Sequence, residues 1–173
     1  MTAAPVLDPR HTALVLVDLM DRIVALPLAP REGAAALAAA QRAAAAFRAA
    51  GATVVLVRVE RPVVEQPPGS RLVAGLRAPG DLEVVKRTIG AFQGTGLDER
   101  LQARGIRTLV LGGIATNLGV ESTARAAADL GYDLVFAEDA MTAFTAAEHE
   151  ASVRLDFPRL GTVARVADLG FSA

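Results

Sequence analysis

Two charged side chains each follow a short apolar run, at positions where a carboxylate and an ammonium could act together. Asp18 comes directly after the run 13–17, and Lys86 comes directly after the run 82–85. A carboxylate at the end of a buried strand is costly unless it is paired, hydrogen-bonded or used in a reaction. A nearby lysine would keep it charged, and the carboxylate would keep the lysine protonated. Taken singly, Asp18 also fits a helix cap or a structural acceptor, and Lys86 fits a solvated strand end.

A third candidate is the turn LGGIATNLG at residues 111–119, where an apolar run leads into a helix expected to start at Gly119. Backbone N–H groups at a helix N-terminus lack intrahelical partners, and the helix dipole adds partial positive charge. Such a turn can hold an anion or an oxyanion. Thr116 or Asn117 could equally be a simple N-cap. Glu121 in the first turn complements the dipole and is interpreted as structural.

Other reactive groups are absent or poorly placed. The chain has no cysteine, which excludes disulfides, thiolate catalysis and zinc–thiolate sites. His11 and His149 have no ligand spacing between them, so no metal site is predicted. The glycines that begin at Gly112 lack the G-x-G-x-x-G spacing of dinucleotide sites. Ser70 and Ser122 lack a G-x-S-x-G context. We therefore expect neither a metal nor a cofactor.

The elements that must position these residues alternate along the chain. Apolar runs rich in β-branched residues predict strands at 13–19, 53–59, 82–85, 108–113, 133–137 and 162–166. Helical periods predict helices at 32–50, 96–104, 119–130 and 146–155. Three of these helices are followed by Gly51, Gly105 and Gly131, as expected for helix ends. Near-continuous Val/Leu runs are typical of a buried parallel sheet. The pattern predicts one doubly wound α/β domain over residues 1–173.

Charge and hydropathy narrow the range of partners. The net charge of -1 and the absence of a basic patch argue against nucleic acid. The first residues lack the pattern of a signal peptide, and no apolar run is long enough to span a bilayer. A cytoplasmic location without membrane contact is therefore expected. The alanine-rich segment 34–50 would suit tight packing on the sheet or on a second subunit.

With these residues assembled, the chain resembles the isochorismatase-like hydrolase superfamily. The resemblance lies in ALVLVDLMDR, KRTIGAFQGTGLDERLQARGIRTLVLGG, IATNLGVESTARAAADLGYDLVFAEDA and the tail AAEHEASVRLDFPRLGTVARV. The elements AF-x-G-T-x-L and T-N-x-x-V-E-S-T-A-R are individually specific, and the match covers most of the chain apart from residues 60–80. It implies a three-layer αβα sandwich with a six-stranded, mostly parallel, Rossmann-like sheet. It also suggests a homo-oligomer, either a dimer or a tetramer.

Members of that family usually use an aspartate, a lysine and a cysteine. By position, Asp18 matches the aspartate, Lys86 matches the lysine, and Gly119 occupies the place of the cysteine. The resemblance further implies a cis peptide at Ile114–Ala115 and an oxyanion hole made by the backbone N–H groups of Ala115 and Gly119. A bacterial subgroup with T-N-x-G-V-E-S-T-A-R carries the same glycine, and its substrate does not follow from the sequence.

The glycine directs the functional hypothesis, because without a thiol the thioester route of the family's amidases is closed. Isochorismatases proper also lack the cysteine, and they hydrolyse a vinyl ether with the aspartate as general acid. The sequence therefore favours cofactor-independent hydrolysis of a small anionic non-amide substrate, with Asp18 as the acid. A nearby lysine favours the wrong protonation state, which burial or an anionic substrate would have to offset. The alternatives are a catalytically silent small-molecule binder, an oligomeric partner protein, or an amidase that Gly119→Cys would restore.

Candidate substrate-binding residues flank the long proline-containing loop 60–80 and the turn. Arg58, Arg61 and Arg71 could bind a carboxylate, although solvated arginine is the simpler interpretation. Thr116 and Asn117 could contact the substrate from the turn. The loop is either a lid or substrate wall, or a tolerated surface insertion.

Overall fold

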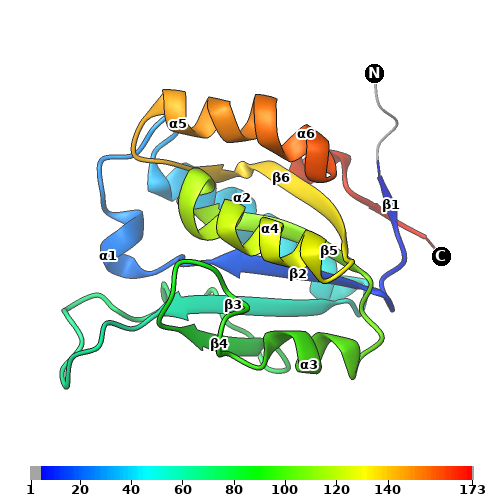
Figure 1. The fold of residues 1–173 in the computed structure, drawn as a ribbon, viewed down its shortest axis with the longest axis horizontal. Helices are drawn as coiled ribbons and strands as arrows, with labels where there is room; N and C mark the ends of the chain where they lie inside the picture. Colours follow the sequence, from blue (N-terminus) through cyan, green and yellow to red (C-terminus); the bar gives the residue numbers. More distant parts are fainter. Residues whose placement is uncertain (1–4, 173) are drawn as a thin grey trace.

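The computed structural model describes residues 5–172 and is built around a parallel sheet (Figure 1). The sheet has six strands in the order β4-β3-β2-β5-β6-β7, and every neighbouring pair is parallel. The strands are β2 (Thr12–Val17), β3 (Thr53–Val59), β4 (Leu82–Lys86), β5 (Thr108–Ile114), β6 (Asp133–Thr142) and β7 (Thr162–Ala164). The α/β architecture and all six predicted strands are confirmed.

Every strand of this sheet except β3 differs from its predicted bounds at one end or both, and β2 and β6 show physical reasons for the difference. β2 ends at Val17 because Asp18 has a φ of 54°, outside the strand region. β6 continues past the predicted end at residue 137 to Thr142, and it passes through the polar pair Glu138–Asp139. These side chains are tolerated there because both have partners: Asp139 Oδ1 accepts from the N–H of Val166, and Glu138 pairs with Arg31.

Helices cover both faces of the sheet, which gives the expected three layers (Figure 1). α2 packs its buried alanines and Phe47 on one face, in a cluster with Leu14, Leu16 and Leu56. α3, α4 and α6 contribute to the cluster on the other face. The α-helices are α1 (Asp21–Val24), α2 (Gly33–Ala49), α3 (Leu97–Gln102), α4 (Glu121–Asp129), α5 (Ala146–Ala151) and α6 (Phe157–Leu160). Shorter helical segments are η1 (Thr116–Val120), η2 (Ser152–Asp156) and η3 (Val166–Asp168).

The helix predicted to start at Gly119 begins earlier. The segment η1 is a π-type turn in which the N–H of Val120 bonds to the carbonyl of Ala115 at 3.3 Å, and it leads directly into α4. The N-cap position is Ala115, so the alternative interpretation of Thr116 or Asn117 as the N-cap is wrong. The side chains of the turn are therefore available for contacts beyond their own helix.

The loop 60–80 leaves the sheet after β3 and returns at β4 (Figure 1). Part of it is tied to the segment that follows β2. Met20 and Leu72 form an antiparallel bridge, and the N–H of Val73 bonds to the carbonyl of Leu19 at 3.0 Å. The loop is thus anchored next to the chain that carries Asp18. A separate two-stranded sheet joins β1 (Val6–Leu7) and β8 (Gly170–Phe171).

The sheet order determines how the charged residues meet. Asp18 follows β2 and Lys86 ends β4, and β3 lies between these strands. Strands two positions apart are separated by about 10 Å, so only a long side chain can bridge the gap. Lysine has that length. In residues 5–172, no helix combines the length and apolar character needed to cross a membrane.

Candidate functional site

The candidate site is built around a buried ion pair between Lys86 and Asp18. Lys86 Nζ lies 2.9 Å from Asp18 Oδ2, and the two side chains are only 3% and 9% exposed. The same ammonium donates to the carbonyl oxygens of Thr88 at 3.2 Å and Ile89 at 2.9 Å. These three acceptors hold the lysine in one position at the carboxyl end of the sheet.

Asp18 has one carboxylate oxygen without a partner. Oδ1 is buried and makes no hydrogen bond with any described residue. Burial raises the pKa of Asp18, and this effect outweighs the lowering by Lys86 and by the nearby Arg22. The backbone holds the carboxylate in place, since the N–H of Asp18 bonds to the carbonyl of Val57 at 2.8 Å. Burial and the lysine thus act on the pKa of Asp18 in opposite directions, and burial has the larger effect.

Gly119 lies directly beside this carboxylate. A Cβ at Gly119 would stand 3.6 Å from Asp18 Oδ2, 3.5 Å from the carbonyl oxygen of Ile89 and 3.0 Å from Val17 Cγ1. The Ile114–Ala115 peptide that precedes the turn is cis. The structure therefore brings Asp18, Lys86 and the turn together at one place.

The two polar residues of the turn have different surroundings. Thr116 is fully buried, and its hydroxyl lies 2.8 Å from His149 Nδ1. Asn117 Oδ1 is buried and has no partner among residues 5–172. Among residues 5–172, the buried side-chain nitrogen and oxygen atoms without a hydrogen-bond partner are Asp18 Oδ1 and Asn117 Oδ1. Both belong to the candidate site.

The arginines proposed to bind substrate lie elsewhere. Side chains alternate along a strand. Val57 and Val84 face the same cluster as Val17, so Arg58 and Glu83 face the opposite side of the sheet. Arg58 is bound by Glu83 at 2.8 Å and by Glu60 at 2.7 Å. The structure does not bring Arg58 to Asp18.

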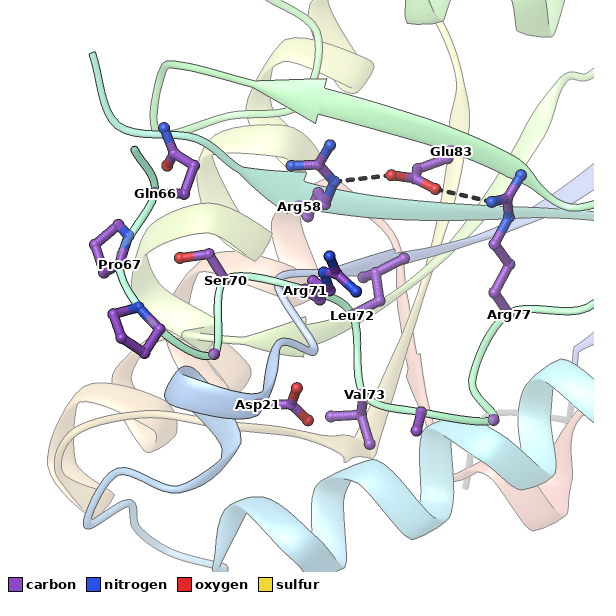
Figure 2. A pocket seen from close by; sticks show the side chains of 14 residues that line it. Asp21, Arg58, Gln66, Pro67, Ser70, Arg71, Leu72, Val73, Arg77 and Glu83 are labelled. Carbon is purple, nitrogen blue, oxygen red and sulfur yellow. Dashed lines mark hydrogen bonds and ion pairs between the residues drawn. The ribbon is translucent and has the colours of Figure 1, made fainter. Parts of the chain in front are cut away.

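Arg58 instead lines a pocket of about 740 Å³ under the loop (Figure 2). Arg71 also lines this pocket, and its side chain makes no ion pair within residues 5–172. Arg77 pairs with Glu83 at 3.3 Å at the same pocket. Arg61 is exposed in the loop, where its backbone bonds Gln66.

Sequence reasoning missed two residues near the site. Arg22 lies close enough to Asp18 to affect its pKa and donates to Ser70 Oγ at 3.1 Å. The sequence could have pointed to Arg22, because it is the last residue of the motif ALVLVDLMDR, which also contains Asp18. His149 was considered only as a metal ligand, and no signal in the sequence joins it to Thr116. No group of three or more histidine, aspartate or glutamate side chains within residues 5–172 could hold a metal ion.

Comparisons with known proteins match nearly the whole chain to one family. The family model described as Isochorismatase domain matches residues 12–168. The uncharacterized isochorismatase family protein YecD of Escherichia coli O157:H7 is 40% identical over 94% of this chain and 96% of its own length. The structure of an isochorismatase family protein from Burkholderia thailandensis superposes with a TM-score of 0.87 at 37% identity, covering 96% of this chain and 97% of that one.

A further relative matches only a segment. Ureidoacrylate amidohydrolase RutB of Variovorax paradoxus is 53% identical over 62 residues, which are 36% of this chain and 25% of that protein. The family model and the two full-length matches each cover nearly all of the sheet and its helices. The chain belongs to the isochorismatase family.

Proposed function

We propose that this protein hydrolyses a small anionic substrate of the vinyl-ether type, with Asp18 as the general acid. The observation that carries the proposal is the unpartnered, buried Oδ1 of Asp18. A carboxyl group in that state is ready to donate a proton to a bound molecule, and burial raises its pKa toward the range in which it is protonated.

The charge of the site favours an anionic substrate. When Asp18 is protonated, the positive charge of Lys86 is no longer balanced by its closest partner. An ammonium that is 3% exposed has little water to screen it, so a carboxylate of the substrate would gain a strong attraction. The N–H groups of the turn add partial positive charge on the same side.

The reaction needs no nucleophilic side chain. Asp18 would transfer its proton to the terminal carbon of the vinyl group, and the ether carbon would become an oxocarbenium ion. Water would add to that carbon and lose a proton, and the resulting hemiketal would break into a ketone and an alcohol. One water is consumed and the aspartate regains its proton. We propose that Gly119 occupies the place of the cysteine of the family's amidases, which would leave this route open and exclude a thioester.

The test is to run the hydrolysis of isochorismate in D₂O and to monitor it by proton NMR. We expect pyruvate whose methyl group carries one deuterium from solvent, since the proton is transferred to carbon. Asp18→Asn should lower kcat at least about 100-fold, the lower end of the contribution typical of a positioned acid. Asp129→Asn is the matched control, because Asp129 is an exposed carboxylate on α4. Turnover that is unchanged in Asp18→Asn would exclude the acid role.

A second candidate is a small-molecule binder without catalysis, and the pocket under the loop favours it. The pocket volume of about 740 Å³ is within the range of ligand sites, and Arg71 offers a guanidinium without an ion partner within the described chain. This candidate would be supported if isochorismate binds but is not turned over. The binding should then be lost in Arg71→Ala and kept in Asp18→Asn.

A further inference from the structure

A buried hydrogen bond connects the turn beside Asp18 to a different helix. His149, on α5, is 2% exposed and is the buried residue of that helix. Its Nδ1 lies 2.8 Å from Thr116 Oγ1, and Thr116 is fully buried. Thr116 directly follows the cis peptide Ile114–Ala115 and is the first residue of η1, the segment that contains Gly119. The contact therefore joins α5 to the centre of the turn.

The surroundings of the imidazole determine where its hydrogen lies. Arg31 Nη1 donates to the carbonyl oxygens of Glu138 and Met141, which uses both hydrogens of that nitrogen. It therefore has no hydrogen to spare for His149 Nε2, which lies 3.5 Å away. Glu138 Oε1 lies 3.7 Å from Nε2, and Arg31 Nη2 pairs with that oxygen at 3.0 Å.

The hydroxyl of Thr116 also needs an acceptor, and His149 is its hydrogen-bond partner within the described residues. If the hydrogen of the imidazole is on Nε2, it faces the carboxylate of Glu138, and Nδ1 is free to accept from Thr116. The opposite tautomer would leave Nε2 facing a carboxylate and the hydroxyl hydrogen without an acceptor. Burial and the charge of Arg31 lower the pKa of His149, which favours the neutral ring.

We propose that His149 is a positioning residue, whose Nδ1 accepts a hydrogen bond from the hydroxyl of Thr116 and thereby holds the turn 115–119 against Asp18. The link to hydrolysis rests on the proposed function, but the hydrogen bond itself can be tested without it. Gly119 lies so close to Asp18 that a Cβ there would stand 3.6 Å from the carboxylate. A displacement of the turn by about 1 Å is enough to cost about 100-fold in rate.

Two substitutions of His149 separate the roles of its nitrogens. In His149→Asn the side-chain oxygen can take the place of Nδ1, and in His149→Gln the side-chain amide reaches the place of Nε2 instead. We expect His149→Asn to keep kcat within about threefold, and His149→Gln to lower it at least about tenfold with a smaller change in KM. Thr116→Ser should behave like His149→Asn, and Thr116→Val like His149→Gln. His11→Gln is the matched control, because His11 precedes β2, at the opposite end of that strand from Asp18, and its Nδ1 lies 2.8 Å from the carbonyl oxygen of Gly105.

A second readout needs no turnover. Nitrogen NMR of the wild-type protein should show His149 neutral, with its hydrogen on Nε2. The amide signal of Gly119 should move in Thr116→Val and stay near its wild-type position in Thr116→Ser. A hydrogen on Nδ1, or a Gly119 signal unaffected by Thr116→Val, would overturn the proposal. Equal kcat in His149→Asn and His149→Gln would also overturn it.

The two proposals fail in different ways. If Asp18→Asn leaves turnover unchanged while the Gly119 amide follows Thr116, the acid role is wrong and the positioning contact stands. If turnover depends on Asp18 but His149→Gln equals the wild type in both kcat and the Gly119 signal, the acid role stands and the positioning contact is wrong.

Discussion

At the scale of single residues, the candidate site and its surroundings contain two titratable groups, Asp18 and His149, whose pKa values are shifted by burial. Burial raises the pKa of Asp18 and lowers that of His149. Both shifts favour the neutral form, which suits a proton donor in one case and a hydrogen-bond acceptor in the other. The residue types were visible in the sequence. Their burial, which decides the direction of both shifts, depends on contacts between distant segments.

The lowered pKa of His149 predicts a pH dependence of stability. Between the depressed pKa in the folded state and the ordinary value of 6.5, the unfolded chain binds more protons than the folded one. The contribution of His149 to stability is therefore complete above pH 6.5 and is lost as the pH falls through the depressed pKa. The charged groups around the ring that influence it are Arg31, Glu138 and Glu150.

The measurement is urea unfolding at a series of pH values for the wild type and for His149→Asn, which has no titrating ring. We expect the stability difference between the two proteins to shift in favour of the variant as the pH is lowered below 6.5. A difference that stays constant across this range would show that the ring is protonated equally in the folded and unfolded states.

At the scale of elements, apolar runs were enough to predict every strand of the main sheet. Strand ends were less predictable, because Asp18 leaves β2 through a backbone conformation that no residue pattern specifies. Likewise β6 passes through Glu138 and Asp139, whose partners lie far along the chain. The face of Arg58 followed from the register of β3 against β4, which a single sequence does not reveal. Sequence patterns report local preferences, whereas the missed features depend on pairing across the sheet.

One element contact should have a large effect on stability. Arg48 in α2 binds both oxygens of Asp81, at 3.1 Å and 2.6 Å, and Asp81 is 3% exposed. Arg48→Ala would leave a buried carboxylate without its cation, and we expect a loss of about 3 kcal/mol in the free energy of unfolding. Arg48→Ala combined with Asp81→Asn should recover part of that loss. Arg42→Ala, an exposed arginine on the same helix, is the control.

Urea unfolding of these four variants, including Asp81→Asn alone, measures the coupling between the two side chains. Additive effects of Arg48→Ala and Asp81→Asn would show that the ion pair contributes little to holding α2 against the segment before β4.

At the scale of the whole molecule, the family relationship and the sheet were foreseeable because the family elements T-N-x-x-V-E-S-T-A-R and AF-x-G-T-x-L carry them in the sequence. Assembly stays a prediction. The resemblance suggests a dimer or tetramer, and the surface of this chain exposes large apolar side chains such as Leu26, Phe144 and Leu155. Exposed apolar side chains of this size are a common feature of contact surfaces when they gather in patches.

Light scattering coupled to size-exclusion chromatography tests the expected assembly. We expect a mass of two or four chains that does not change on dilution through the micromolar range. A mass of one chain throughout that range would exclude a stable homo-oligomer.

The three contacts of Lys86 have a consequence for how it can act. An ammonium has three hydrogens, and here each one points at a protein oxygen, on Asp18, Thr88 or Ile89. The lysine therefore has no hydrogen left to donate in a hydrogen bond to a substrate or to pass on in a proton relay. Its influence on a bound molecule is that of a stationary electric field, set by distance and dielectric rather than by directional contact.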